Sequence, residues 1–427
     1  MGQHVRVGGP KLPKVRIIGG GLTGVLAAFQ AHELGVRDIE LHDRFDQLGG
    51  QAVPRQDHGL ELRERDLTFG SAADPVRRLL ESHGVPFEDI ENRKGAVTAC
   101  NGDLTYTRDF NGPALRTRDL GLSPLAGDSL ADRIRAYPTD IAQALSRICQ
   151  WRLGAWLDEV HADTAAAIGV SRVFPVGPEI VEIAGLKRAD TNHDALYGIP
   201  APLWGRLQSL GASTPKDGLG PFFMRLRQAL VRLGVTLTAP SFVSPHAALA
   251  GRNADEVVVW AADPRPLFKP FDLEAPKPEA HSLVTYILKV RYAGHPPLEV
   301  RNFTAQGAVT RLRLYETRGQ VLLAAECLTE TRDTDLRREI HRLMAGFGGA
   351  GLSLGETLAI RMEPRWDILS LDAARKLTHL RKALTRSEGA AFVAPRWEEQ
   401  DVAARHAALT LDLAQALQVS APAVLAA

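Results

Sequence analysis

The sequence predicts an α/β protein, with a parallel sheet built partly from N-terminal residues and an inserted α+β region further along the chain. Three observations support this class. Residues 15–43 follow the order strand, glycine turn, helix, strand. Residues 91–204 are mostly helical in pattern, and residues 281–327 alternate apolar and polar side chains as strands do. The length of 427 residues suggests two or three folding units at roughly 100–200 residues each.

The composition excludes several classes of protein. The chain has 51 basic and 50 acidic residues, whereas a general nucleic-acid or anionic-membrane binder needs a clear basic excess. No apolar run approaches the ~20 residues of a membrane span, and the first residues lack the apolar core of a signal peptide. The cysteines Cys100, Cys149 and Cys327 are far apart and show no metal-ligand spacing. We therefore expect a cytoplasmic protein without disulfides, a bound metal or an integral membrane segment.

The most specific sequence pattern lies in residues 15–43. Residues 15–18 are β-branched and apolar, which predicts a buried strand, and a GxGxxG motif follows at residues 19–24. Residues 25–35 have apolar side chains at helical spacing, and residues 39–42 predict a second strand. Asp43 ends that strand 19 residues after the last glycine, close to the ~20 expected for an acid that accepts from a ribose hydroxyl. An acid here also favours an unphosphorylated ribose.

Each position of the motif has a physical reason. We expect Gly19 to permit the tight turn, Gly21 to let the backbone approach a pyrophosphate, and Gly24 to let the helix pack on the strand. The first helical residues, Leu22 and Thr23, then offer free N–H groups at the positive end of the helix dipole. The sequence therefore predicts a Rossmann-like dinucleotide site.

The residues after the acid narrow the choice of dinucleotide. Asp43 and Arg44 are followed by the pair Gly49-Gly50 and then Gln51. This resembles the acid and Gly-Gly extension of the FAD-dependent flavin amine oxidase superfamily, which includes protoporphyrinogen oxidase and UDP-galactopyranose mutase. The resemblance implies noncovalent FAD, with the backbone of residues 49–51 close to the pyrophosphate.

Later segments extend the resemblance. A glycine-rich turn at residues 215–220 precedes a helical pattern over 222–233, and short extended segments follow, one of them at Phe242 and Val243. In the superfamily a valine backbone in this place meets the adenine, which implies that role for Val243. Residues 254–262 resemble the next strand, which rejoins the cofactor-domain sheet.

Two departures from the superfamily pattern concern the cofactor. The chain has Pro395 and Arg396 where the superfamily has Gly-Asp or Gly-Arg, and proline removes one backbone N–H donor. Arg396 either compensates by a contact with phosphate or is a surface residue. In the loop 66–70, Asp66 and Thr68 stand in place of the expected glycine and histidine.

Catalytic residues are not readable from the sequence. Amine oxidases commonly place a lysine near the flavin, and Lys289, in a predicted strand, is a candidate for that role. Thr285 is an alternative for the same position, and a solvated strand lysine is the competing interpretation of Lys289. Other candidates for a substrate pocket are Tyr286, Tyr292, Tyr315, Arg311, Arg313 and Arg318.

The resemblance implies a glutathione reductase-type FAD fold: a Rossmann-like FAD-binding domain of residues 1–90, 205–275 and 375–427, with a substrate domain of residues 91–204 and 276–374. It implies a flavin-dependent biosynthetic oxidoreductase that oxidises a small organic substrate by hydride transfer to FAD. The alternatives are a mutase-like flavin isomerase and a degenerate auxiliary protein. We expect a small-molecule substrate at the domain boundary and no nucleic-acid partner; the oligomeric state stays open.

Overall fold

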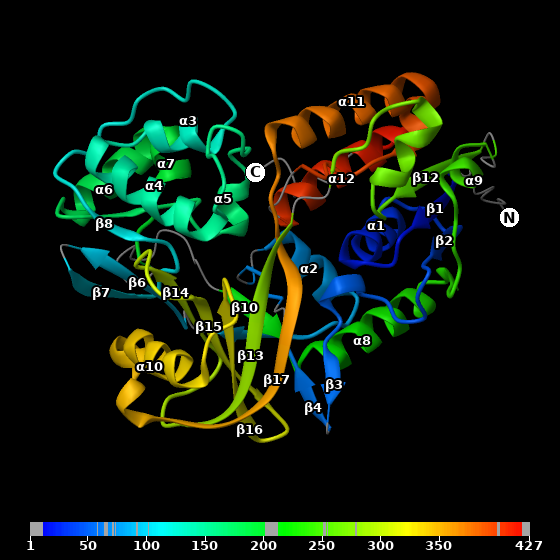
Figure 1. Cartoon of the computed structure of the whole chain (residues 1–427). Helices are drawn as coiled ribbons and strands as arrows, with labels where there is room; N and C mark the ends of the chain where they lie inside the picture. The colour runs from blue at the N-terminus through cyan, green and yellow to red at the C-terminus, as the bar shows by residue number, and fades with distance from the viewer. Residues whose placement is uncertain are drawn as a thin grey trace, which may run out of the picture.

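Two sheets organise the chain in space (Figure 1). The computed structural model describes residues 12–57, 59–63, 67–70, 72, 74–90, 93–100, 102–200, 212–250, 253, 255–277, 280–398 and 402–420. The first sheet has five strands and the second has seven.

The five-stranded sheet is parallel throughout, in the order β11-β2-β1-β12-β18. Its central strands are apolar because both faces of the sheet are covered. For example, Val15 pairs with Ile39 on one side and Val257 on the other. The strands span Lys14–Ile18 (β1), Ile39–His42 (β2), Thr236–Thr238 (β11), Glu256–Trp260 (β12) and Phe392–Val393 (β18).

Helices cover both faces of this sheet, as in a doubly wound fold. One face packs Val15, Ile17 and Val259 against four helices: α1 (Leu22–Glu33), α2 (Pro75–Ser82), α8 (Leu219–Arg232) and α12 (Val402–Ala416). The other face packs Ile18 and Trp260 against α9 (Pro245–Ala250) and α11 (Leu371–Glu388). Alternate residues of one strand therefore serve two separate cores.

The seven-stranded sheet has the order β17-β13-β16-β15-β14-β6-β7 and is antiparallel except where β14 meets β6. One face carries α10 (Asp333–Met344), which buries Leu336, Ile340 and Leu343. Its strands are β6 (Lys94–Cys100), β7 (Asp103–Arg108), β13 (Ala280–Tyr292), β14 (Leu298–Phe303), β15 (Val309–Thr317), β16 (Gln320–Cys327) and β17 (Leu352–Asp367).

The other face of this sheet packs Leu283 and Phe303 against a group of helices, which we call the helical lobe. Figure 1 shows this lobe beside α11, with the long strands β13 and β17 rising between them. The helical lobe comprises α3 (Leu130–Arg135), α4 (Thr139–Leu153), α5 (Thr164–Ala167), α6 (Ile180–Ala189) and α7 (Thr191–Leu196). Shorter pairs complete the fold: β3 (Arg55–Asp57) with β4 (Leu60–Leu62), β5 (Phe87–Ile90) with β10 (Ala212–Pro215), and β8 (Ala114–Arg116) with β9 (Phe174–Val176).

The structure confirms the α/β class and the parallel N-terminal sheet. Two details differ from the sequence prediction. The described residues of the range 91–204 contain four strands and become helical only from Leu130 onward. Phe242 and Val243 lie in a loop, because β11 ends at Thr238 and Pro240 cannot donate to a strand ladder. Within the described residues, no helix is both long and apolar enough to cross a membrane.

Candidate functional site

The GxGxxG turn lies where the carboxyl ends of β1, β2 and β12 meet. The Gly19 N–H donates to the His42 carbonyl over 2.8 Å, and Gly19 has a φ of +109°. A Cβ on Gly19 would lie 2.8 Å from the backbone of Ala261, and one on Gly24 would lie 1.8 Å from the Gly19 carbonyl oxygen. These two glycines are therefore required by packing within the chain itself.

Gly21 is different, because its surroundings are open. A Cβ built on Gly21 would meet no atom within 4 Å. Gly21 is also the N-cap of the 12-residue helix α1, and no side chain caps it. The N-terminus of such a helix offers free N–H groups and a positive dipole, here from Leu22 and Thr23, to an anionic ligand. The space above Gly21 therefore fits a phosphate group.

Asp43, the residue after β2, stabilises the GxGxxG turn by hydrogen bonds. Its carboxylate accepts hydrogen bonds from the N–H groups of Gly20 and Phe45, the latter over 2.7 Å. A Cβ on Gly20 would lie 2.8 Å from Asp43 Oδ2, so this second glycine is required as well. Each carboxylate oxygen has a further lone pair, which leaves Asp43 able to accept from a ribose hydroxyl.

The second pair of glycines lies against the first motif. Gly49 donates to the Gly20 carbonyl over 2.8 Å and forms a parallel bridge with Gly21. Its φ is +116°, and a Cβ there would lie 2.5 Å from the Phe223 ring. A Cβ on Gly50 would lie 3.4 Å from Gly21 Cα. The structure thus brings together two glycine segments that are about 30 residues apart in sequence.

Charged groups gather at the same edge of the sheet. Arg44 follows Asp43, is exposed, and holds its guanidinium 4.6 Å from the Phe45 ring centroid. Asp263 follows β12. Burial raises the pKa of Asp263, but hydrogen bonds from Arg265 and the charge of Arg44 outweigh this effect and hold that pKa below its usual value.

The remaining residues predicted to bind the cofactor are less closely tied to the glycines. Gln51 is exposed in a single 3-10 turn, Gly50–Ala52. Val243 packs its side chain against the core around Ile18 and Trp260. Arg396 is exposed three residues after the last residue of β18, as a neighbour to buried Pro395. Their contact with a cofactor stays a prediction.

The loop that departs from the superfamily pattern is described only in part. Asp66 lies outside the described residues, and Thr68 is exposed. Phe69 forms a bridge with Ser213, the Phe69 N–H donating to the Ser213 carbonyl over 2.9 Å. This fixes the loop against β10.

The catalytic candidate Lys289 does not join this site. Its side chain is 40% exposed and makes an ion pair with Glu356. It lies nine positions along β13 from Ala280, which is ~30 Å of extended strand, and Figure 1 shows β13 running away from α11 and α12. Thr285 is buried within the same strand. The structure therefore favours the interpretation of Lys289 as a solvated strand lysine.

Most of the other candidates also have structural partners. The hydroxyl of Tyr286 bonds the backbone of Thr331, and that of Tyr292 donates to the Phe347 carbonyl over 2.6 Å. Arg311 and Arg313 both bind the buried carboxylate of Glu326.

Tyr315 and Arg318 line a polar cavity of about 570 Å³ between the β3–β4 hairpin, β10 and β15. Glu61 in this cavity caps α8 by accepting from the N–H groups of Leu219 and Gly220, over 3.2 and 3.1 Å. Arg63 donates to the same carboxylate over 2.6 Å. The charges of Glu61 and Arg63 are therefore already paired within the protein.

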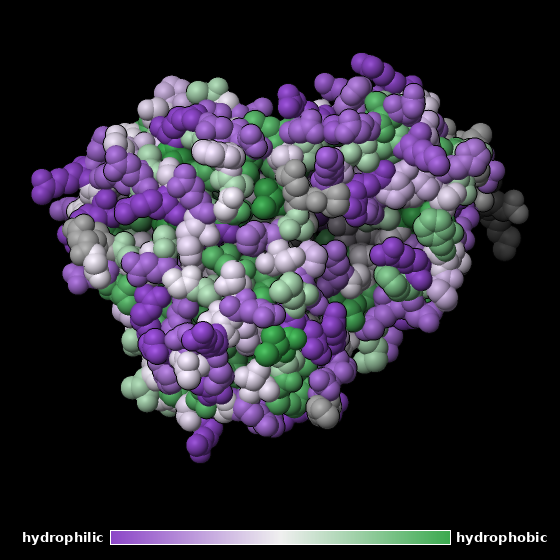
Figure 2. All heavy atoms as spheres, viewed as in Figure 1, coloured by the Kyte–Doolittle hydropathy of each residue, from purple (hydrophilic) through white to green (hydrophobic). Residues whose placement is uncertain are grey.

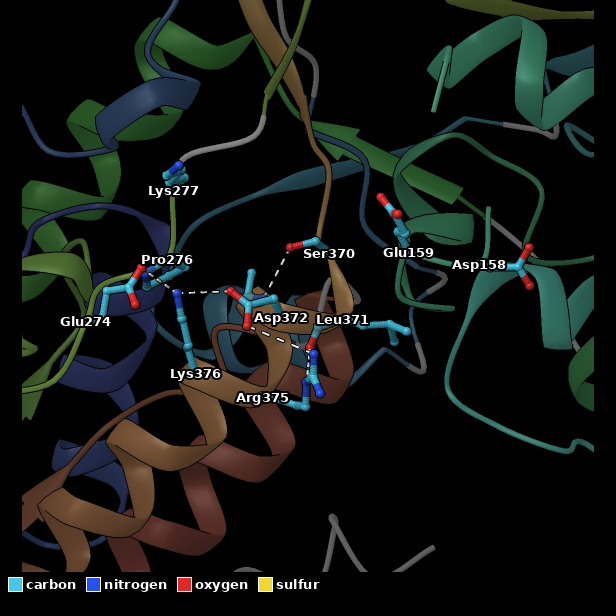
Figure 3. Close-up of a pocket in the computed structure, with 11 residues that line it drawn as sticks. Asp158, Glu159, Glu274, Pro276, Lys277, Ser370, Leu371, Asp372, Arg375 and Lys376 are labelled. Carbon is cyan, nitrogen blue, oxygen red and sulfur yellow. Dashed lines mark hydrogen bonds and ion pairs between the residues drawn. The ribbon is translucent and has the colours of Figure 1, made fainter. Parts of the chain in front are cut away.

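A larger cleft separates α11 from the helical lobe. Its two cavities, of about 420 and 830 Å³, share Asp158, Leu371 and Arg375. Figure 2 shows the surface dipping between these two parts, with hydrophilic side chains on both rims. Figure 3 shows the smaller cavity, where Lys376 reaches Glu274 and Asp372 over 2.9 and 3.0 Å.

Among the described residues, this cleft has unpaired charges of both signs: Lys277, Lys382 and Arg386 are positive, and Asp128 and Glu159 are negative. Arg375, His379, Lys382 and Arg386 recur at helical spacing and form one exposed stripe on α11, which we call the basic stripe. Among the described residues, neither Lys382 nor Arg386 makes an ion pair. On the opposite wall, the acidic groups Asp132 and Asp158 are both held by one arginine, Arg135. The spacing of the stripe could have been read from the sequence, but its position beside a cleft could not.

Comparison with known proteins agrees with this architecture. No family model and no curated protein matches the chain. Solved structures do: reduced UDP-galactopyranose mutase, at 13% identity and a TM-score of 0.62, matches over 97% of each chain. A protein assigned as protoporphyrinogen oxidase, from Exiguobacterium sp. 255-15, has 13% identity and a TM-score of 0.57 over 95% of this chain and 99% of its own. An engineered putrescine oxidase has 14% identity and a TM-score of 0.54 over 95% and 99%.

The chain has the fold that these three solved structures share. The resemblance read from the first fifty residues is therefore confirmed, and it extends over nearly the whole chain. At 13–14% identity this likeness concerns the fold, so the chemistry must be argued from the site itself.

Proposed function

We propose that the protein is an FAD-dependent oxidoreductase that binds FAD noncovalently in a glutathione reductase-type domain. One observation carries the proposal: the open space at Gly21, at an uncapped helix N-terminus, with Gly49 and Gly50 alongside. The domain would comprise residues 1–90, 205–275 and 375–427, and the substrate domain the two segments between them.

The roles of the residues follow from their positions. Leu22 and Thr23 would donate their N–H groups to the pyrophosphate, where Gly21 leaves room for it. Asp43 would accept from the ribose while it braces the glycine turn. Arg44 and Arg396, both exposed at the carboxyl edge of the sheet, would supply positive charge to the phosphates. Arg396 would thereby replace the N–H donor that Pro395 lacks.

The backbone of Val243 would meet the adenine, because Val243 follows β11 at the edge next to β2. The cofactor would supply hydride acceptance, and the protein would supply position and electrostatics. Substrate would approach through the cleft between α11 and the helical lobe. We infer an anionic small molecule, since Lys382 and Arg386 of the basic stripe line this cleft and make no ion pair among the described residues.

The visible absorption spectrum of freshly purified protein tests the cofactor assignment. Oxidised-flavin bands that leave the protein on heating would support noncovalent FAD. Protein that is colourless, and stays colourless after incubation with FAD, would refute the assignment and favour an auxiliary role.

Charge reversal tests the substrate path. Lys382→Glu should raise KM for an anionic substrate about tenfold while kcat changes little, because a screened exposed cation acts mainly on binding. Arg147→Glu, an exposed arginine on α4 that does not line the cleft, is the matched control. Equal KM values in the two variants would contradict this path.

A mutase-like isomerase is the second candidate. The likeness in fold to UDP-galactopyranose mutase and the arginines of the basic stripe favour it. Turnover of a sugar nucleotide only when the flavin is reduced, without net oxidation, would select the isomerase over the oxidoreductase.

A further inference from the structure

The far end of α1, opposite the glycine turn, holds a group of metal-binding side chains. His32 and Glu33 are the last residues on α1, and His83 is the C-cap of α2. One ligand atom from each lies within 4.8 Å of the others. No sequence motif predicts this group, because His32 and His83 are 51 residues apart.

A ring nitrogen of His32 is buried and unsatisfied. His32 Nδ1 is removed from solvent and has no hydrogen-bond partner. An unpaired polar atom in this position costs free energy unless a ligand satisfies it. His83 is held in place by stacking on Phe29, with ring centroids 4.8 Å apart, and its ring meets that of His32 edge-on at 5.9 Å.

The third group completes an open site. Glu33 Oε1 lies 3.1 Å from His83 Nε2, and the Glu33 side chain is 45% exposed. Two imidazoles and one carboxylate form a donor set typical of zinc sites that keep a fourth position for water. The exposure of Glu33 gives an ion a route from solvent.

Two helix ends at this position favour a cation. The C-terminal ends of α1 and α2 converge here, and each carries the negative end of a helix dipole.

Two nearby guanidinium groups are occupied elsewhere. Arg37 donates to the carbonyls of His32 and Val36, over 2.9 and 3.1 Å. Arg232 donates to the His83 carbonyl over 3.1 Å. Both cations therefore engage backbone oxygens, although their charges still oppose a bound ion.

We propose that His32, Glu33 and His83 bind one divalent first-row transition metal ion of the zinc class, with water as the fourth ligand. The ion clamps the end of α1 to the end of α2. The site lies ~18 Å along α1 from Gly21, so it is separate from the cofactor site and does not depend on the proposed function.

Metal titration of the full chain tests the proposal. Protein stripped with a chelator is titrated with ZnCl₂ by calorimetry, and with CoCl₂ while the visible spectrum is recorded. We expect one ion per chain, the intense visible bands of tetrahedral cobalt, and a higher Tm with zinc. His83→Gln and Glu33→Gln should each weaken zinc binding at least tenfold, because each removes one of three ligands.

The control is His246→Gln, which alters an exposed histidine on α9 and should bind zinc as the wild type does. If His83→Gln fails to fold, Glu33→Gln still decides the question, because its side chain is largely at the surface. Equal zinc affinity in the wild type and Glu33→Gln, or no zinc-dependent change in Tm, would show that the group is only an ordinary His83–Glu33 ion pair.

Discussion

Replacing Gly21 by valine should abolish FAD binding without destabilising the protein. Gly21 has extended backbone, with φ −65° and ψ 174°, which a β-branched residue adopts readily. Its Cβ would meet no protein atom within 4 Å. The folding free energy of the apoprotein should therefore change by no more than about 0.5 kcal/mol, as for other substitutions that meet open space.

The effect on the cofactor should be large. The isopropyl group would occupy the space that a pyrophosphate needs to reach the N–H groups of Leu22 and Thr23. Hydrogen bonds to a charged group contribute about 1.5–3 kcal/mol each. Loss of two such bonds corresponds to a weakening of roughly 10²- to 10⁴-fold.

The assay compares apoprotein unfolding with FAD binding, measured by quenching of flavin fluorescence. The contrasting variant is Gly24→Ala, whose Cβ would lie 1.8 Å from the Gly19 carbonyl oxygen. Because the backbone fixes the position of the Cβ and the Gly19 carbonyl is itself backbone, the helix must shift, and we expect a loss of about 1–3 kcal/mol in apoprotein stability. Undiminished FAD affinity in Gly21→Val would refute the placement of the pyrophosphate.

Two further predictions concern Asp43 and His406. Asp43→Asn should lower apoprotein stability by about 1–3 kcal/mol and should also lower FAD retention. The reason is that an amide cannot accept through both of its terminal atoms from the N–H groups of Gly20 and Phe45. Unchanged FAD retention in spectra of the purified variant would contradict the ribose role of Asp43. Burial lowers the pKa of His406 to about 4, although the charge of Asp74 partly offsets this effect. Below pH 6.5 the unfolded chain therefore binds a proton at His406 that the folded chain does not bind. The free energy of unfolding should therefore fall by up to about 3 kcal/mol between pH 6.5 and 4. Measured by urea unfolding, this free energy should depend less on pH in His406→Leu than in the wild type, whereas His246→Gln should behave as the wild type does.

The cofactor end of the fold was predictable because its constraints are local. The turn at Gly19, the helix after it and the acid that ends β2 are neighbours in sequence, so one short pattern specifies them all. The requirement for glycine at Gly20 was not predicted, because it arises from contact with Asp43, 23 residues away. The resemblance implied that residues 49–51 approach the pyrophosphate, but the bridge between Gly49 and Gly21 was not predicted.

The substrate end was less predictable because it depends on distant pairings. Lys289 lies in a strand, as expected, but nothing in the sequence told which end of that strand faces the cofactor sheet. The extended segment expected at Phe242 and Val243 lies in a loop and not in the sheet, because Pro240 cannot donate to a strand ladder. The cleft and the group at His32 and His83 are both formed by segments far apart in sequence.

This difference in predictability between the cofactor end and the substrate end has a physical origin, which also decides the sequence in which the experiments should be done. A pyrophosphate is recognised by backbone N–H groups, so its site demands glycines and leaves a pattern in the sequence. A substrate is recognised by exposed side chains such as Lys382 and Arg386, which in sequence resemble any solvated helix face. The fold is shared by an oxidase and a mutase alike, so it cannot distinguish the two reactions. The flavin must therefore be established first, and its redox state during turnover must then decide between them.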